Sequence, residues 1–242
     1  MLKPPSHLRT SNFPLTLAAP SFINDSFLPM FAARCARAIR SIRLPSALVE
    51  QFAAERIIDV AVSIGIEGRL PKTWSSEAVG EVHYGLFGAP GLVQSLGPTP
   101  TREEICRIPF VVPLYVRASG VLEVGDDRCP LGRDERLVGH EVESIGLACY
   151  VAAQTDHLVY GPRLAAAPLL REGALVELAS SDLGRSDPLL LACSPDGITA
   201  SVHEALASTL RTIFASAHPS SIVPVSPVRA WSAAPASRRG RT

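Results

Sequence analysis

The segment Thr155–Leu178 (TDHLVYGPRLAAAPLLREGALVEL) constrains the fold more than any other part of the chain. A short apolar stretch at 158–160 predicts a strand, and the Gly-Pro pair after it leads into a helix expected over 164–170. Gly173 then turns the chain into a second apolar stretch at 174–178. This order of strand, helix and strand predicts a unit of an α/β fold.

The same alternation runs through residues 13–64. Strands are expected where apolar residues are continuous or alternate with polar ones, and helices where they recur every three or four residues. The first helix is expected over 24–39, with Phe27 and Phe31 on one side and with Pro29 tolerated near its start. The alternation predicts a parallel, right-handed wound sheet. Its other elements are expected to be strands at 13–18, 39–44 and 57–64 and a helix at 47–55.

The rest of the chain adds strands and helices in a less regular order. Thr101 and Glu104 form a capping box, and Ser144 is a suitable N-cap for the apolar helix that follows it. Residues 117–136 are expected to be loop and turn with a weak strand, and 183–187 to be a linker. Further strands are expected at 79–87, 110–115, 137–142 and 188–193, and helices at 90–96, 145–154 and 201–214.

Composition and charge exclude several classes of protein. Of 242 residues, 47% are hydrophobic and 19% charged, which suits one large domain or two small lobes. No apolar run reaches the ~18 residues of a membrane span, and the N-terminus lacks the pattern of a signal peptide. The formal net charge is zero, and the one basic cluster, 238–241, is expected to be solvated rather than bound to nucleic acid. We therefore expect a cytoplasmic protein that makes no membrane contact.

Motifs for metal binding and catalysis are missing from the sequence. The five cysteines are odd in number and include no C-x-x-C pair, so neither a zinc site nor a disulfide framework is expected. The chain also lacks a nucleophile elbow, an H-E-x-x-H motif, a Walker loop and a dinucleotide-binding glycine motif. His140-Glu141 has no second histidine at zinc-site spacing. We expect no cofactor and no enzymatic activity.

Several stretches together resemble the effector-binding domain of LysR-type transcriptional regulators, over about Phe13 to Phe214. LTLAAPSFINDSFLPMF is similar to that family's first strand, ligand loop and first helix, and LVEQFAAERIIDVAVSIG to its next helix–strand pair. VHYGLFGAPGLV resembles the strand that enters the second lobe. TDHLVYGPRLA, LREGALVEL and DPLLLAC resemble the far lobe and the return strand. Each stretch is a weak pattern, and their order and spacing carry the resemblance.

The resemblance implies an α/β fold of two Rossmann-like lobes of the periplasmic-binding-protein type 2, joined by two crossing strands. Lobe I would comprise 13–78 and 187–217, and lobe II would comprise 79–186. A flexible lead at 1–12 and a disordered tail at 218–242 would flank them.

The family also implies a function, which is to bind a small-molecule effector and to regulate transcription through a DNA-binding unit. Residues 1–12 are too short for the family's winged helix-turn-helix, so direct DNA contact by this chain is not expected. A homodimer or tetramer is implied, with 27–37 of one chain against 145–153 of its neighbour. Two alternatives are a stand-alone solute-binding protein and the inactive remnant of a truncated regulator gene.

Ligands of open α/β sheets bind outside the carboxyl ends of the strands, which places the effector between the lobes. Helix N-termini at that place favour an anion, so we expect a small carboxylate. The expected ligand-binding residues are Ser21, Phe22, Asn24, Ser46, Ile64, His140 and Ser144. The alternatives are that the polar residues only cap helices, that the phenylalanine lies in the core and that the histidine lies on a strand surface.

Overall fold

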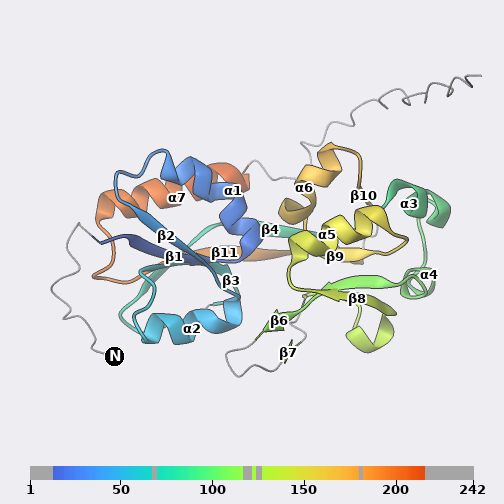
Figure 1. Cartoon of the computed structure of the whole chain (residues 1–242), viewed down its shortest axis with the longest axis horizontal. Coiled ribbons are helices and arrows are strands. Elements are labelled where there is room, and N and C mark those ends of the chain that lie inside the picture. The colour runs from blue at the N-terminus through green and yellow to red at the C-terminus, as the bar shows by residue number, and fades with distance from the viewer. Residues whose placement is uncertain (1–12, 67–69, 117–121, 124–126, 180–181, 216–242) are drawn as a thin grey trace, which may run out of the picture.

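The computed structural model describes residues 13–66, 70–116, 122–123, 127–179 and 182–215, and these form a mixed α/β structure (Figure 1). The strands are β1 (Leu15–Ala19), β2 (Ile39–Arg43), β3 (Val60–Ile64), β4 (Ser75–Gly88), β5 (Phe110–Pro113), β6 (Tyr115–Val116), β7 (Leu122–Glu123), β8 (Val138–Val142), β9 (Val159–Pro162), β10 (Val176–Glu177) and β11 (Arg185–Cys193). The helices are α1 (Ser21–Ala32), α2 (Ser46–Ala54), α3 (Pro90–Leu96), α4 (Arg102–Cys106), α5 (Ile145–Gln154), α6 (Arg163–Arg171), α7 (Ala200–Ala215) and the short 3₁₀ helix η2 (Arg133–Glu135).

The elements gather in two groups, which lie left and right in Figure 1. We name the left group, β1 to β3 with α1, α2 and α7, lobe I. The right group, α3 to α6 with β5 and β8 to β10, is lobe II. A seven-stranded sheet in the order β10-β4-β11-β3-β1-β2, with β9 also on β4, runs through both groups. The α/β class expected from the alternating pattern is confirmed.

Lobe I is built on three parallel strands. β1 lies between β2 and β3 and pairs with both in parallel. Every residue of β1 and β3 is buried, because α1 and α7 cover one face of the sheet and α2 covers the other (Figure 1). Phe27 and Phe31 of α1 are fully buried on the first face, and Val49 of α2 is fully buried on the second. Burial on both faces explains why these strands are continuous apolar runs.

Two long antiparallel strands connect the lobes. β11 pairs with β4 from Arg185 opposite Tyr84 to Cys193 opposite Ser75. β4 then continues into lobe II, where β9 and β10 pair with it. The lobe boundaries predicted at 78/79 and 186/187 fall inside these continuous strands, and they stay a prediction.

Lobe II places α5 and α6 against the second part of the sheet. β5 pairs in parallel with β8, and a bridge from Phe110 to Leu158 attaches this pair to β9. Ile145 and Leu169 of the two helices pack with Phe87 and Val111 of the strands in one buried cluster. Between β5 and β8, the described residues form the β6–β7 pair and η2 but no α-helix. A crossover between parallel strands usually contains an α-helix, so this connection is unusual.

Local sequence signals set some element ends well. The helices predicted at 90–96 and 145–154 are confirmed residue for residue. The capping box is present, because the Thr101 side chain accepts from the Glu104 backbone and the Glu104 carboxylate accepts from the Thr101 backbone N–H. Ser144 caps α5 by accepting a hydrogen bond from the Leu147 backbone N–H.

The predictions for the first helix and for the linker are wrong. The first helix begins at Ser21 and ends at Ala32, so Pro29 lies in its last turn rather than near the start expected for a helix over 24–39. Pro20 precedes this helix as its N-cap, without a side-chain cap. The linker predicted at 183–187 is partly strand, because β4 extends to Tyr84 and gives Arg185–Asp187 pairing partners. Such a partner depends on a distant strand and cannot be read from the segment itself.

The lead predicted at 1–12 and the tail predicted at 218–242 lie outside the described residues. Within the described ranges, no helix combines the length and the hydropathy that a membrane span requires.

Candidate functional site

The carboxyl ends of strands from the two lobes face each other along β4. On the lobe I side, Ile64 at the end of β3 pairs with Leu189, which also pairs with Gly80 of β4. On the lobe II side, Pro162 at the end of β9 pairs with Tyr84 of β4. Four residue steps of β4 separate these ends, about 13 Å at the usual rise of a strand. α2 and α6 begin directly beyond β2 and β9, and α1 directly beyond β1.

Ser46 joins two strand ends of lobe I. Its hydroxyl lies 2.7 Å from that of Ser63, which is fully buried in β3. Ser46 is the first residue of α2, and the N-cap is Pro45, so the capping alternative for Ser46 is wrong. Ile64, the next residue of β3, is 7% exposed and packs in the lobe I core.

Asn24 ties the ends of β1 and β2 together. Its side-chain amide donates to the backbone carbonyls of Ala19 at 3.1 Å and Ile42 at 3.4 Å, and the residue is buried. Its Oδ1 is buried and has no hydrogen-bond partner among the described residues. Neither Asn24 nor Ser21 caps α1, since this helix has no side-chain cap. Ser21 is half-buried at the first position of the helix.

Phe22 packs against both lobes. It is half-buried and contacts the cluster around the lobe I strands as well as the cluster of Ile145 and Leu169 in lobe II. The alternative that this phenylalanine lies in the core is therefore confirmed only in part, because it covers the junction between two cores.

His140 lies on the exposed surface of β8 and stacks on His157, with ring centroids 4.5 Å apart. The alternative of a histidine on a strand surface is confirmed. Burial lowers the pKa of His157, and the neighbouring His140 lowers it further, while Asp156 acts in the opposite direction. His140 lies in the middle of β8, and His157 lies just before β9. Ser144 lies two residues beyond the end of β8.

A charged cluster that sequence reasoning missed lies at the junction. Arg128 Nη1 donates to Asp187 Oδ2 at 2.7 Å, and Arg185 donates from Nε and Nη2 to Asp187 Oδ1. The Arg128 guanidinium lies directly against Gly65, the residue after β3, where any Cβ would collide with it. Gly65 also has φ of 64°, which favours glycine. Arg128 and Gly65 are 63 positions apart by their numbers, so no local pattern could have revealed the contact.

A second ion pair holds the loop that carries Arg128. Asp127 accepts hydrogen bonds from Arg136 at 2.6 and 3.1 Å and from the Cys129 backbone N–H at 3.2 Å. The Arg136 side chain is 4% exposed and lies over the ring of Phe110. Removal from water makes this pair costly to break, so it fixes the start of the loop relative to β5.

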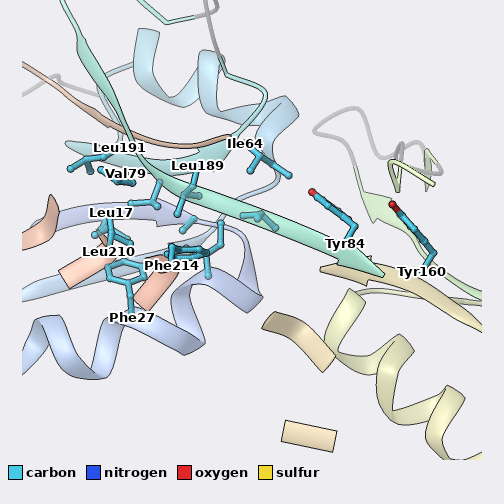
Figure 2. Close-up of a cluster of buried hydrophobic side chains, with 14 of the residues drawn as sticks. Leu17, Phe27, Ile64, Val79, Tyr84, Tyr160, Leu189, Leu191, Leu210 and Phe214 are labelled. Atoms are coloured by element: carbon cyan, nitrogen blue, oxygen red, sulfur yellow. The ribbon is translucent and has the colours of Figure 1, made fainter. Parts of the chain in front are cut away.

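Two tyrosines form the wall of the junction beside this cluster. Tyr84 of β4 and Tyr160 of β9 stack with ring centroids 5.9 Å apart, and the Tyr160 hydroxyl donates to the Leu183 carbonyl. Figure 2 shows the two rings side by side, beyond Ile64 and separate from the core around Phe27. Burial raises the pKa of Tyr160, so the phenol stays neutral at physiological pH.

The described cysteines and potential metal ligands do not favour thiol or metal chemistry. Burial raises the pKa of Cys129 to about 11 and that of Cys149 to about 12, which disfavours the reactive thiolate. No group of three or more histidine, cysteine and acidic side chains suited to a metal ion occurs in the described part of the chain.

No protein-family model and no curated protein matches the sequence. Solved structures do match. A probable transcriptional regulator of Pseudomonas aeruginosa, PA0477, superposes with a TM-score of 0.64 at 21% identity, over 84% of this chain and 68% of that one. The regulatory domain of MexT, a transcriptional activator of the same organism, gives 0.62 at 20% identity, over 83% of this chain and 100% of that domain. Full-length LysG of Corynebacterium glutamicum with bound effector Arg superposes with a TM-score of 0.59 at 16% identity, over 85% of this chain and 69% of that one.

These likenesses define the class of fold, which is the periplasmic-binding-protein type 2 fold. Within that class, the chain has the fold of the regulatory domains of LysR-type transcriptional regulators. The resemblance seen in the sequence is confirmed at the level of the fold.

Proposed function

We propose that this chain is the effector-binding domain of a transcriptional regulator and that its effector, a small carboxylate, binds between the lobes. The observation that carries the proposal is the register along β4, which brings the carboxyl ends of β3 and β9 face to face. This is the position where open α/β sheets bind ligands. The regulatory domains with the same fold support an effector-binding role, and one of them, LysG, has bound effector Arg.

The local structure favours an anionic ligand. α1 and α6 begin within two residues of the ends of β1 and β9, and α2 begins three residues after the end of β2. The first N–H groups of these helices have no partner inside the helix. Ser21 at the start of α1 and the Ser46–Ser63 pair add hydroxyl groups at the same place. In this proposal Phe22 covers an apolar part of the ligand, because its side chain already packs against the cores of both lobes.

His140 and Ser144 are proposed as weaker contributors. The Ser144 hydroxyl already accepts from the Leu147 backbone N–H, and His140 stacks on His157. Both residues approach a ligand only if it extends toward the end of β8. Asn24 and Ile64 shape the site from within the lobe I core.

A thermal-shift and calorimetry panel tests the proposal. The panel pairs benzoate, acetate and glutarate with benzamide, acetamide and glutaramide at matched ionic strength. At least one carboxylate is expected to raise the melting temperature and to give a saturable binding isotherm. A folded protein that no member of the panel stabilises would contradict the proposal.

We further propose that the chain assembles as a homodimer or tetramer through α1 and α5. Leu147 and Tyr150 of α5 are 42% and 59% exposed, and Met30 of α1 is 40% exposed, so both helices present large apolar side chains to solvent. Tyr150→Glu is expected to shift the mass measured by light scattering to that of a monomer. The exposed Phe13→Glu is the control, and an unchanged mass of Tyr150→Glu would exclude this surface.

In the cell, this domain would act in the cytoplasm, without catalysis, and would control DNA only through a separate DNA-binding unit.

A further inference from the structure

An ion pair lies directly after the strand end that lobe II contributes to the proposed site. Arg163 is the first residue of α6 and follows Pro162, the last residue of β9. Its Nε and Nη2 atoms donate to Oε1 of Glu177 at 2.9 and 2.6 Å. The two side chains are 28% and 24% exposed, so the pair is partly shielded and still open to solvent. The helix dipole favours negative groups at a helix start, so the charge of Arg163 does not stabilise α6.

The pair lies on a part of the sheet that has no side chains of its own. Gly85 of β4 and Gly161 of β9 are direct partners across the two strands. A Cβ at Gly85 would lie 2.5 Å from Oε1 of Glu177. A Cβ at Gly161 would lie 2.5 Å from Cδ1 of Ile145, the first residue of α5. The two glycines therefore let the carboxylate and the start of α5 approach the strands closely.

Lobe I lies against the same elements of lobe II. α1 lies beside α5 and α6 (Figure 1). Phe22, near the start of α1, packs against the buried cluster that contains Ile145 and Ala166. Ala166 lies one turn beyond Arg163 in α6. A ligand between the lobes would therefore meet the ion pair at the place where the start of α1 reaches lobe II.

The pair distinguishes ligands by their charge. A ligand carboxylate that binds Arg163 also lies near the Glu177 carboxylate, which repels it. A ligand that carries an ammonium group as well is attracted by both side chains. Because Nη2 and Oε1 are 2.6 Å apart, the two charges of the ligand must also be close together. An α-amino acid meets this condition, since it carries both groups on one carbon.

We propose that the Arg163–Glu177 pair selects α-amino acids as effectors, with Arg163 donating to the carboxylate and Glu177 accepting from the ammonium group. This inference rests on the proposed function and narrows its small carboxylate to a zwitterion. The hydrogen bonds within the pair end on Oε1 of Glu177, so Oε2 takes no part in them. The bound amino acid adds charge-assisted hydrogen bonds without breaking the ion pair.

Calorimetry with matched ligands tests the inference on the wild-type chain. Glycine, glutamate and phenylglycine are compared with acetate, glutarate and phenylacetate, which lack only the amino group. At least one amino acid is expected to bind about ten- to a hundredfold more tightly than its partner acid, the usual value of a hydrogen bond to a charged group. N-acetylation removes the ammonium charge and should abolish this advantage. These measurements need no variant, so they hold even where a variant does not fold.

Variants then assign the effect to the pair. Glu177→Gln is expected to equalise the affinities for the amino acid and its partner acid, because the group that accepts from the ammonium loses its charge. Arg163→Gln should weaken the binding of both ligands by about ten- to a hundredfold. Arg171→Gln and Glu172→Gln are the matched controls. They remove the same charges at the far end of α6, where both residues are exposed, and should bind like the wild type.

The other outcomes separate this inference from the proposed function. If carboxylates bind but amino acids bind no more tightly than their partner acids, the site between the lobes stands and the inference is overturned. If Glu177→Gln folds and keeps the preference for the amino acid, another group holds the ammonium and the inference is again overturned. If neither the acids nor the amino acids bind, the proposed function fails together with the inference.

Discussion

Lobe I and lobe II use related elements in different ways. In lobe I, both crossovers between parallel strands contain a helix, α1 or α2, and β1 and β3 are buried on both faces. In lobe II, the described crossover from β5 to β8 contains the β6–β7 pair, a loop and η2 in place of an α-helix. That loop carries Arg128. The difference indicates that lobe I is built on buried, regularly paired strands, whereas the charged residues of lobe II lie on an irregular segment that ion pairs hold.

The largest loss of stability is expected from a substitution in the lobe I core. Phe27 is fully buried in α1, so Phe27→Ala should lower the free energy of unfolding by about 3–5 kcal/mol, through lost burial and the cavity left behind. Urea denaturation followed by circular dichroism measures it. Phe13, which is 53% exposed, is the control, and Phe13→Ala should change stability by less than about 0.5 kcal/mol. Equal effects of the two variants would contradict the packing described for lobe I.

The next largest loss of stability is expected when the Asp127–Arg136 ion pair, which holds the loop of lobe II, is broken. Asp127→Ala leaves Arg136 buried without its partner, and it should cost about 3 kcal/mol in the same urea experiment. Asp134→Ala removes an exposed carboxylate from the neighbouring turn and should have little effect. Hydrogen exchange in residues 127–132 should accelerate only in Asp127→Ala. A loop that exchanges equally in both variants would show that the pair does not hold it.

A smaller effect is expected at the strand ends of lobe I. Ser46→Ala removes the side chain that shares a hydrogen bond with the buried Ser63 hydroxyl, and it should cost about 1–2 kcal/mol. In the double variant Ser46→Ala/Ser63→Ala, the total loss should be smaller than the sum of the single losses, because the unpaired hydroxyl is then removed as well. Additive losses would argue against the serine contact.

The smallest expected effect is a pH dependence of stability that comes from His157 on the surface of lobe II. The pKa of His157 lies below its ordinary value, because burial and His140 disfavour its protonated form, with Asp156 opposing them. The unfolded chain therefore takes up the proton more readily than the folded one. Stability from this residue is complete above the ordinary histidine pKa, near 6.5, and is lost as the pH falls below it.

Urea midpoints between pH 8 and pH 5 measure this dependence. His157→Gln should have a flatter profile than the wild type. A profile that is unchanged in His157→Gln would assign the pH dependence to other groups.

The sequence predicted the regular parts of the molecule well. Ser144 and the apolar run after it defined α5, and Pro90 defined the start of α3, because caps and prolines act on their own neighbours. The order of strands and helices predicted the α/β class for the same reason. It also placed Ser21, Ser46 and Ile64 at strand or helix ends, since an end is a local property of the chain.

The charged part of the candidate site was not predictable in this way. Arg128 stood in a polar loop, DDRCPLGRD, and Arg185 and Asp187 in a segment expected to be a linker. Nothing in either segment indicates that they meet, or that both lie beside Gly65. A charged residue on a loop has the same local sequence whether it is solvated or forms part of a site.

The sequence alone therefore determined most of the stretches that form strands and helices, and that they alternate as in an α/β fold. Only the tertiary structure decided which strand ends face each other, how far β11 extends along β4, and which arginine reaches Gly65. The physical reason is the range of the forces involved. Caps, turns and hydrophobic periodicity act over a few residues, whereas strand pairing and ion pairs join residues that the chain keeps far apart.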